Sequence, residues 1–280
     1  MQPYPMEYVM ADSNDSAKPD FRVDGKVIVV TGGVGILGKV YCRALAESGG
    51  TVVVADIDQD ACEALVSGLP GEHLAAPVDL ADEQSIVEWS AALNDRFGAV
   101  DVLLNNAAAR PPNIFAKHHA FPLDDWNQMV AVNMTAPFLT TRELGPAMAE
   151  RGRGSIINVS SIYGVVGPDQ RIYEGSRYEE QGGEIRTPMA YSATKGAVVS
   201  MTRYLAAYWG ETGLRTNCIT PGGVGSGQNS TFTEKYSNRV PMHRMARADE
   251  MAGAVLYLAS DASSYVNGHN LVIDGGWTAW

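Results

Sequence analysis

The sequence predicts a single doubly wound α/β domain built on a parallel sheet of about seven strands. From residue 23 onward, short apolar runs rich in β-branched residues alternate with longer helical stretches, a pattern typical of strands that are buried on both faces. No linker rich in serine, glycine or proline separates these units, and no repeat of fixed period is present. One domain is therefore expected over residues 23–280. A chain of 280 residues that is 45% hydrophobic can bury one large core.

Composition excludes several functional classes. With 21 basic and 32 acidic side chains, the formal net charge is -11, which would repel a nucleic acid or an anionic membrane surface. Cys42, Cys62 and Cys218 are far apart in the sequence, so we expect reduced thiols in a cytoplasmic protein, without a disulfide framework or a metal site. Residues 1–22 lack the apolar core of a secretion signal, and we expect a flexible or subunit-contacting arm.

The first strand, expected at residues 27–30, leads into a glycine-rich turn at residues 31–38. Gly32 and Gly35 permit a tight turn and a close backbone approach, and a helical pattern opens directly after them. The free amides at a helix N-terminus, here those of Ile36 and Leu37, attract a pyrophosphate. Strand, turn and helix together indicate a dinucleotide site, although a plain tight turn would contain the same glycines.

Asp56 follows the second expected strand, residues 51–55. A carboxylate roughly twenty residues beyond the glycine-rich turn would accept hydrogen bonds from the adenosine ribose hydroxyls and would repel a 2′-phosphate. This position favours NAD over NADP as the cofactor. The alternative reading of Asp56 is a helix cap or a turn residue.

Three further strands end in candidate cofactor residues at the same edge of the sheet, where ligands of such sheets bind. These candidates are Asp79 and Leu80 after strand 73–78, Asn106 and Ala107 after strand 102–104, and Pro221 and Gly222 after strand 216–219. Asp79 would meet the adenine amino group, or would cap the helix expected at residues 83–97. A helix at residues 249–260 and a strand at residues 271–273 complete the predicted domain.

Tyr191 and Lys195 are candidate catalytic residues, because a spacing of four places both on one face of a helix. A nearby ammonium group favours the ionised phenol, so Tyr191 would exchange protons near neutral pH, as alcohol and ketone interconversion requires. The alternative is a chance pair with a solvated lysine. Ser161 follows a strand at residues 155–159, and Asn133 lies inside a helix expected to begin near residue 123, where its amide is more useful than its weak helix propensity.

In this order, the motifs resemble those of the short-chain dehydrogenase/reductase family, which has a Rossmann-type fold. The resemblance implies that Tyr191 moves a proton to or from the substrate oxygen while the nicotinamide of NAD exchanges a hydride with the carbon. It further implies that Lys195 holds the nicotinamide ribose and lowers the pKa of Tyr191, that Ser161 or alternatively Ser160 orients the substrate, and that Asn133 binds a water. As structural alternatives, Ser161 would form a turn and Asn133 would serve the helix.

The sequence departs from the family pattern in two places. Ile36 stands where the family has its second glycine, and its side chain would crowd the pyrophosphate. An unusually long gap separates Ser161 from Tyr191, so we expect an insertion at residues 168–187 that forms a lid or substrate wall. Its polar side chains favour a polyhydroxylated ligand, with a surface loop or subunit contact as the alternative. Residues 224–244 are expected to form a flexible flap over the substrate.

The leading hypothesis is an NAD-dependent oxidoreductase that interconverts a secondary alcohol and a ketone on a sugar or sugar-derived substrate. Candidate substrate contacts are Ser161, Tyr163, Arg110, Arg171 and Tyr173. One alternative keeps the chemistry on a hydrophobic alcohol, steroid or acyl thioester, and another is a catalytically silent dinucleotide-binding sensor or scaffold. The resemblance implies a homotetramer or homodimer, and the aromatic tail at residues 277–280 would either contact a second subunit or pack in its own core.

Overall fold

The computed structural model describes residues 20–178 and 184–280. Residues 1–19 of the predicted arm and residues 179–183 of the predicted insertion lie outside this range. Within the described range, no helix has both the length and the apolar character needed to cross a bilayer.

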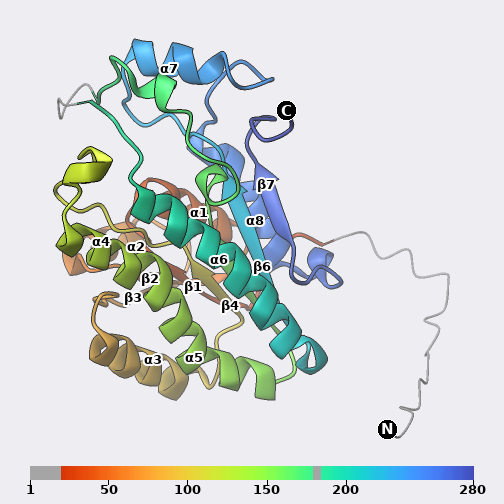
Figure 1. Ribbon diagram of the computed structural model, residues 1–280. Helices are drawn as coiled ribbons and strands as arrows, with labels where there is room; N and C mark the ends of the chain where they lie inside the picture. The colour runs from red at the N-terminus through yellow and green to blue at the C-terminus, as the bar shows by residue number, and fades with distance from the viewer. Residues whose placement is uncertain (1–19, 179–183) are drawn as a thin grey trace, which may run out of the picture.

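Seven strands form one parallel sheet in the order β3-β2-β1-β4-β5-β6-β7 (Figure 1). They are β1 (Val27–Thr31), β2 (Thr51–Ala55), β3 (Leu74–Ala75), β4 (Val102–Asn105), β5 (Gly154–Val159), β6 (Leu214–Pro221) and β7 (Asn270–Ile273). The strand order reverses between β1 and β4, and a crevice for a ligand forms at the carboxyl ends of strands at such a switch point. The predicted fold class is confirmed.

Helices cover both faces of the sheet. One face carries α1 (Ile36–Glu47), α2 (Gln59–Ser67) and α8 (Ala252–Ala259), and the other carries α3 (Glu83–Phe97), α5 (Ala136–Glu150) and α6 (Met189–Tyr208). Figure 1 is viewed from the side of α5 and α6. Alternate side chains of β1 enter the two cores: Ile28 and Val30 pack with the α1 side, and Val29 packs with the α3 side. Burial on both faces explains why these strands are continuous apolar runs.

Three segments differ from the predicted elements. The third strand is only Leu74–Ala75, at the edge of the sheet, where β2 is its one neighbour among the described strands. The helix expected from residue 123 begins as α4 (Leu123–Val130), passes through a π-helical turn, η2 (Ala131–Thr135), and continues as α5. Residues 224–244 contain α7 (Ser230–Ser237), a helix that was not predicted, and a flexible flap over the substrate stays a prediction.

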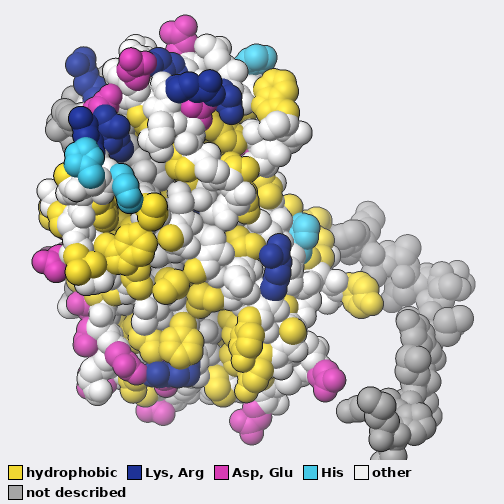
Figure 2. Space-filling model, in the orientation of Figure 1, with side chains coloured by type: hydrophobic (Ala, Val, Ile, Leu, Met, Phe, Trp, Pro, Cys, Tyr) yellow, Lys and Arg dark blue, Asp and Glu magenta, His cyan; other side chains and the backbone are white. Residues whose placement is uncertain are grey.

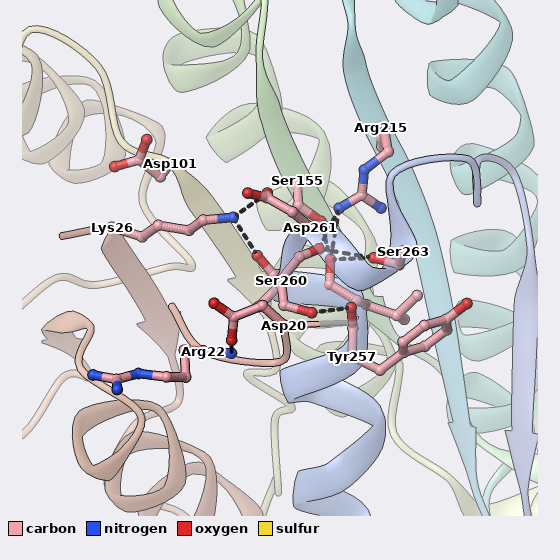
Figure 3. Close-up of polar contacts among 12 residues, drawn as sticks. Asp20, Arg22, Lys26, Asp101, Ser155, Arg215, Tyr257, Ser260, Asp261 and Ser263 are labelled. Atoms are coloured by element: carbon pink, nitrogen blue, oxygen red, sulfur yellow. Dashed lines mark hydrogen bonds and ion pairs between the residues drawn. The ribbon is translucent and has the colours of Figure 1, made fainter. Parts of the chain in front are cut away.

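A polar network at the amino ends of the strands ties the last helix to the sheet (Figure 3). Arg215 of β6 and the Ser155 hydroxyl of β5 both donate to the Leu258 carbonyl near the end of α8, at 2.9 and 2.8 Å. Lys26 donates to the Asp261 carboxylate just beyond this helix at 2.7 Å. Cationic side chains at a helix C-terminus satisfy its free carbonyls. This edge is therefore a structural anchor, opposite to the edge that carries the candidate site residues.

The aromatic tail is divided between core and surface. Trp277 is buried and stacks on Tyr236 of α7 with ring centres 4.6 Å apart. Trp280 is 78% exposed. Core packing within one subunit therefore accounts for Trp277, and only Trp280 presents the exposed aromatic surface considered for the tail.

Candidate active site

The glycine-rich turn between β1 and α1 is held against the end of β4. The Asn106 side chain donates to the carbonyls of Thr31 and Gly32, both at 3.0 Å, and the Thr31 hydroxyl accepts from the Asn106 amide. Gly32 has a φ of +63°, and a Cβ there would lie 2.7 Å from the Ala107 Cα. A side chain at Gly38 would meet the Gly32 carbonyl oxygen at 2.1 Å. Only glycine fits at these two positions, so the turn stays close and its backbone remains accessible.

The N-terminus of α1 opens into a cavity of about 370 Å³. Gly35 is the N-cap residue in an extended conformation, and no described side chain caps this helix end. Ile36 and Leu37 both line the cavity, and Ile36 is 56% exposed. Uncapped amides beside a glycine turn suit the pyrophosphate of a dinucleotide, so this part of the site fits the expected cofactor. That the Ile36 side chain would crowd this pyrophosphate stays a prediction.

Asp56 stands at the end of β2, beside this turn. Its carboxylate accepts from the Ile57 amide at 2.8 Å and from the Val34 amide at 3.3 Å. The cap of α2 is instead Asp58, which accepts from the Ala61 amide at 3.0 Å. The helix-cap alternative for Asp56 is therefore wrong, and its carboxylate borders the glycine-rich turn.

Asp79 is exposed beyond β3, and its carboxylate accepts from the Ala81 amide at 2.8 Å. The cap of α3 is Asp82, which accepts from the Ser85 amide, so Asp79 does not cap that helix. Leu80 is buried beneath it in the core on the α3 side. Asp79 forms a local turn, and a contact with adenine stays a prediction.

Asn133 lies in the π-helical turn and joins three parts of the site. Its Oδ1 accepts from the Ala109 amide at 2.8 Å, and its Nδ2 donates to the Thr194 hydroxyl of α6 at 3.3 Å. The side chain is 1% exposed. A π turn re-aims the residues of a helix and is frequent at functional sites. Here it directs the asparagine amide between the loop after β4 and the residue that precedes Lys195.

Lys195 is buried, with 3% of its surface exposed, and donates to the Val159 carbonyl at the end of β5 at 2.7 Å. Burial lowers the pKa of this ammonium group to about 8. Its Nζ lies 5.8 Å from the centre of the Tyr191 ring, one helical turn away. The spacing of four therefore brings the two side chains together as predicted, and the solvated-lysine alternative is wrong.

The pKa of Tyr191 differs from the expectation. Burial raises the pKa of its phenol, and interaction with the Ser161 hydroxyl opposes this only in part. The net shift is therefore opposite in direction to the expected lowering, and an effect of Lys195 on this pKa stays a prediction. The physical reason is that removal from water disfavours the phenolate more strongly than the surrounding groups favour it.

The two serines after β5 have different roles. The Ser160 hydroxyl donates to the Lys195 carbonyl at 2.7 Å and fixes α6 against the sheet. The Ser161 hydroxyl accepts a hydrogen bond from the Tyr163 amide at 3.2 Å, and its interaction with the Tyr191 phenol lowers the pKa of that phenol. Ser161 is thus both a turn residue and a neighbour of Tyr191, whereas the hydroxyl of Ser160 is used in the scaffold.

The remaining cavity wall is aromatic. Two predicted substrate residues, Tyr163 and Tyr173, line it, and so do Pro221 and Gly222 at the end of β6. Further lining residues that were not predicted include Phe115, Tyr178, Ile185, Thr187, Phe232 and Tyr236. The spacing of four between Phe232 and Tyr236 was a signal of a helix with a buried face.

Two predicted arginines lie elsewhere. Arg171 has 80% of its side chain exposed and pairs with Asp169 at 2.8 Å, so its assignment to the substrate was wrong. Arg110 stacks over the rings of Phe115 and Tyr178, with its guanidinium carbon 5.8 and 4.9 Å from their centres. It packs on two residues of the aromatic wall and is not itself among the lining residues.

Comparison with known proteins decides the family. A model of the short chain dehydrogenase family matches residues 26–178, and a second model, described as enoyl-(acyl carrier protein) reductase, matches residues 178–278. The chain belongs to the short-chain dehydrogenase family. It is an oxidoreductase family whose members bind a nicotinamide dinucleotide, in agreement with the cradle formed by the glycine-rich turn.

Several similar short-chain dehydrogenases are named for a polyol or a sugar acid as substrate. The chain is 33% identical to D-threitol dehydrogenase of Mycolicibacterium smegmatis, covering 92% of this chain and 95% of that protein. It is 33% identical to galactitol 2-dehydrogenase (L-tagatose-forming) of Cereibacter sphaeroides, covering 93% and 98%. A gluconate 5-dehydrogenase from Burkholderia cenocepacia, solved with NADP and tartrate, is 30% identical, with a TM-score of 0.79 over 94% and 98% of the two chains.

Proposed function

We propose that this short-chain dehydrogenase interconverts a secondary alcohol and a ketone on a polyhydroxylated small molecule, with NAD as the hydride carrier. The observation that supports this most directly is one cavity that joins the N-terminus of α1 to Ser161, Tyr191 and Lys195. A dinucleotide at the glycine-rich turn and a substrate at Tyr191 would then share one cavity. A catalytically silent sensor has no need of a tyrosine next to a buried lysine and a buried serine beside that crevice.

Each side chain has a chemical task in this proposal. Bound nicotinamide supplies or accepts the hydride. During reduction, Tyr191 donates its phenolic proton to the carbonyl oxygen and becomes a phenolate, and during oxidation the phenolate takes up the hydroxyl proton and becomes a phenol. Lys195, whose Nζ lies 5.8 Å from the centre of the Tyr191 ring, provides the positive charge that stabilises a transient phenolate. The Ser161 hydroxyl orients the reacting oxygen next to Tyr191, and Asn133 positions the segment of α6 that carries Lys195.

The preference for NAD rests on Asp56. Its carboxylate borders the turn that would hold the pyrophosphate, and it is followed by Ile57, an apolar residue that is 70% exposed. A 2′-phosphate at this place would meet a negative charge and no basic side chain from residue 57. The Burkholderia relative binds NADP, so the cofactor preference is a separate question from the family.

We further propose a cytoplasmic homo-oligomer, a tetramer or a dimer, assembled through α5 and α6. Figure 2 shows hydrophobic side chains gathered over the face that these helices form. Phe138, Tyr204 and Tyr208 are exposed by 51%, 67% and 66%. A second copy would remove this apolar surface from water. The three cysteines, all buried and unpaired, suit a reducing compartment.

The experiment that tests the function is a substrate panel with NAD. D-Threitol, galactitol and gluconate are compared with a long-chain secondary alcohol and a hydroxysteroid, and NADH formation is followed by absorbance. We expect turnover with the polyols first. A response confined to the hydrophobic alcohols would refute the polyol assignment and favour the alternative substrate class, and no response from any alcohol would refute the reaction.

A further inference from the structure

Three hydroxyl groups form a cluster in the cavity wall beside Tyr191. The Tyr173 hydroxyl lies 2.6 Å from the Thr187 hydroxyl. Tyr163 and Tyr173 lie close enough for each phenol to influence the pKa of the other, and both are within electrostatic reach of Tyr191. All four residues line the same cavity. The cluster therefore faces the space in which a substrate of Tyr191 would lie.

The cluster is rigid, and it is built largely by the insertion. Tyr173 and Thr187 come from residues 168–187, whereas Tyr163 follows β5. Tyr173 is 2% exposed and stacks on Phe232 with ring centres 6.0 Å apart, and Tyr163 packs edge-on against Trp277 at 6.5 Å. Such packing holds each hydroxyl in a fixed direction. The insertion thus contributes fixed polar groups to an otherwise aromatic wall.

Among the described charged residues of the insertion, only Arg186 lines the cavity. Glu174 and Arg171 have 87% and 80% of their side chains exposed. Among the described lining residues, the charged ones are Lys195 and Arg186. Lys195 donates to the Val159 carbonyl, and Arg186 pairs with Glu184. The wall therefore recognises a ligand mainly by neutral hydrogen bonds and apolar contact.

Counting protons defines what the cluster can bind. Each hydroxyl has one proton to donate and two lone pairs to accept with. The hydrogen bond between Tyr173 and Thr187 uses one of the three protons, which leaves up to two protons and several lone pairs for a ligand. Burial raises the pKa of both phenols, so they stay protonated and uncharged. A ligand hydroxyl, which both donates and accepts, matches this set.

We propose that Tyr163, Tyr173 and Thr187 bind the hydroxyl on the carbon next to the reacting carbon, so that the substrate class is a neutral vicinal diol. The inference rests on the proposed function, because it is Tyr191 that identifies the reacting carbon. In this arrangement the insertion determines substrate specificity: one hydroxyl lies at Tyr191 and Ser161, and its neighbour lies at the cluster.

The test measures binding without turnover. The Tyr191→Phe protein, which is the parent here, is saturated with NAD and titrated with D-threitol by calorimetry. The same titration is made with three double variants, in which Tyr173→Phe, Thr187→Val or Thr187→Ser is combined with Tyr191→Phe. We expect the first two to weaken threitol binding about tenfold, as expected for the loss of one hydrogen bond. Thr187→Ser keeps the hydroxyl and should retain the affinity. Tyr41→Phe is the matched control, because Tyr41 is fully buried in α1 and its hydroxyl has no partner among the described residues.

A kinetic comparison with Tyr191 intact separates recognition from folding. Tyr173→Phe should raise KM for 2,3-butanediol and leave kcat/KM for 2-butanol unchanged. Equal threitol affinity in Tyr173→Phe, Thr187→Val and their parent would overturn the inference, and so would a parent that binds no threitol. Threitol binding that depends on the cluster, without NADH formation by the intact protein, would support the cluster as a diol site and refute the proposed reaction.

Discussion

The Nζ of Lys195 donates a 2.7 Å hydrogen bond to the backbone carbonyl of Val159. This bond links the centre of α6 to the last residue of β5, where the loop with Ser161 begins. It holds the lysine within the core, 5.8 Å from the centre of the Tyr191 ring. The geometry of the site therefore depends on a buried ammonium group, whose protonation changes the stability of the protein.

The stability of the ligand-free protein should depend on pH through Lys195. Its pKa is about 8 when folded, below the ordinary value of 10.5. Between these values the unfolded chain binds a proton that the folded chain does not, so the free energy of unfolding rises with pH. Relative to Lys195→Met, the native protein should gain up to about 3 kcal/mol between pH 7 and pH 11. Parallel denaturation curves for the two proteins across this range would contradict the buried, titrating lysine.

Tyr191→Phe should abolish turnover and preserve cofactor binding. The variant keeps the ring that packs in the cavity and removes the proton donor, and general acid and base catalysis contributes about 10²- to 10⁴-fold. NADH affinity, measured by fluorescence titration, should change by less than about twofold, because the change leaves the glycine-rich turn and Lys195 intact. Activity close to that of the native protein would show that another group moves the proton.

Asp56→Ser should shift cofactor preference toward NADP. Loss of the carboxylate removes the repulsion of a 2′-phosphate, and we expect the ratio of kcat/KM for NAD to that for NADP to fall at least about tenfold. Asp58→Ser is the matched control. It replaces the neighbouring carboxylate at the N-cap of α2, where serine is also a good cap. The ratio of kcat/KM for NAD to that for NADP should stay unchanged in this variant. The same shift in both variants would mean that general charge, and not the position of Asp56, sets the preference.

Ile36→Gly should lower KM for NAD. The side chain is 56% exposed at the first residue of α1 and lines the cavity, so its removal would open the approach to the helix amides. The helix should lose about 0.5 to 1 kcal/mol of stability from the glycine. The KM of Ile36→Ala for NAD should lie between the values of the native protein and of Ile36→Gly. A KM that rises in both variants would show that Ile36 contacts the cofactor favourably instead of crowding it.

Several site residues could be predicted because their positions follow from local geometry. A spacing of four brought Tyr191 and Lys195 onto one face of α6, and strand ends brought Asn106 and Gly222 to one edge of the sheet. The role of Asn106 in holding the turn was not predicted. Its hydrogen bonds to Thr31 and Gly32 cross 75 and 74 positions of sequence, and no local pattern encodes such a pair.

The insertion shows where prediction from composition fails. Its many polar residues suggested a wall of hydrogen-bonding side chains, yet Arg171 and Glu174 face solvent, and Tyr173 and the apolar Ile185 line the cavity. An irregular segment has no fixed period, so its sequence does not show which side chains point inward. Packing against α7, itself missed in a polar stretch, decided their orientation.

The sequence by itself determined the parallel sheet, the glycine-rich turn, the family and the pairing of a tyrosine with a lysine, because each follows from a short period or a short spacing. Only the tertiary structure decided the charge state of that pair and the composition of the substrate wall. Both depend on which groups are removed from water when distant segments pack together. Burial raises the pKa of Tyr191 and lowers that of Lys195, and burial also selects the phenols that face the ligand.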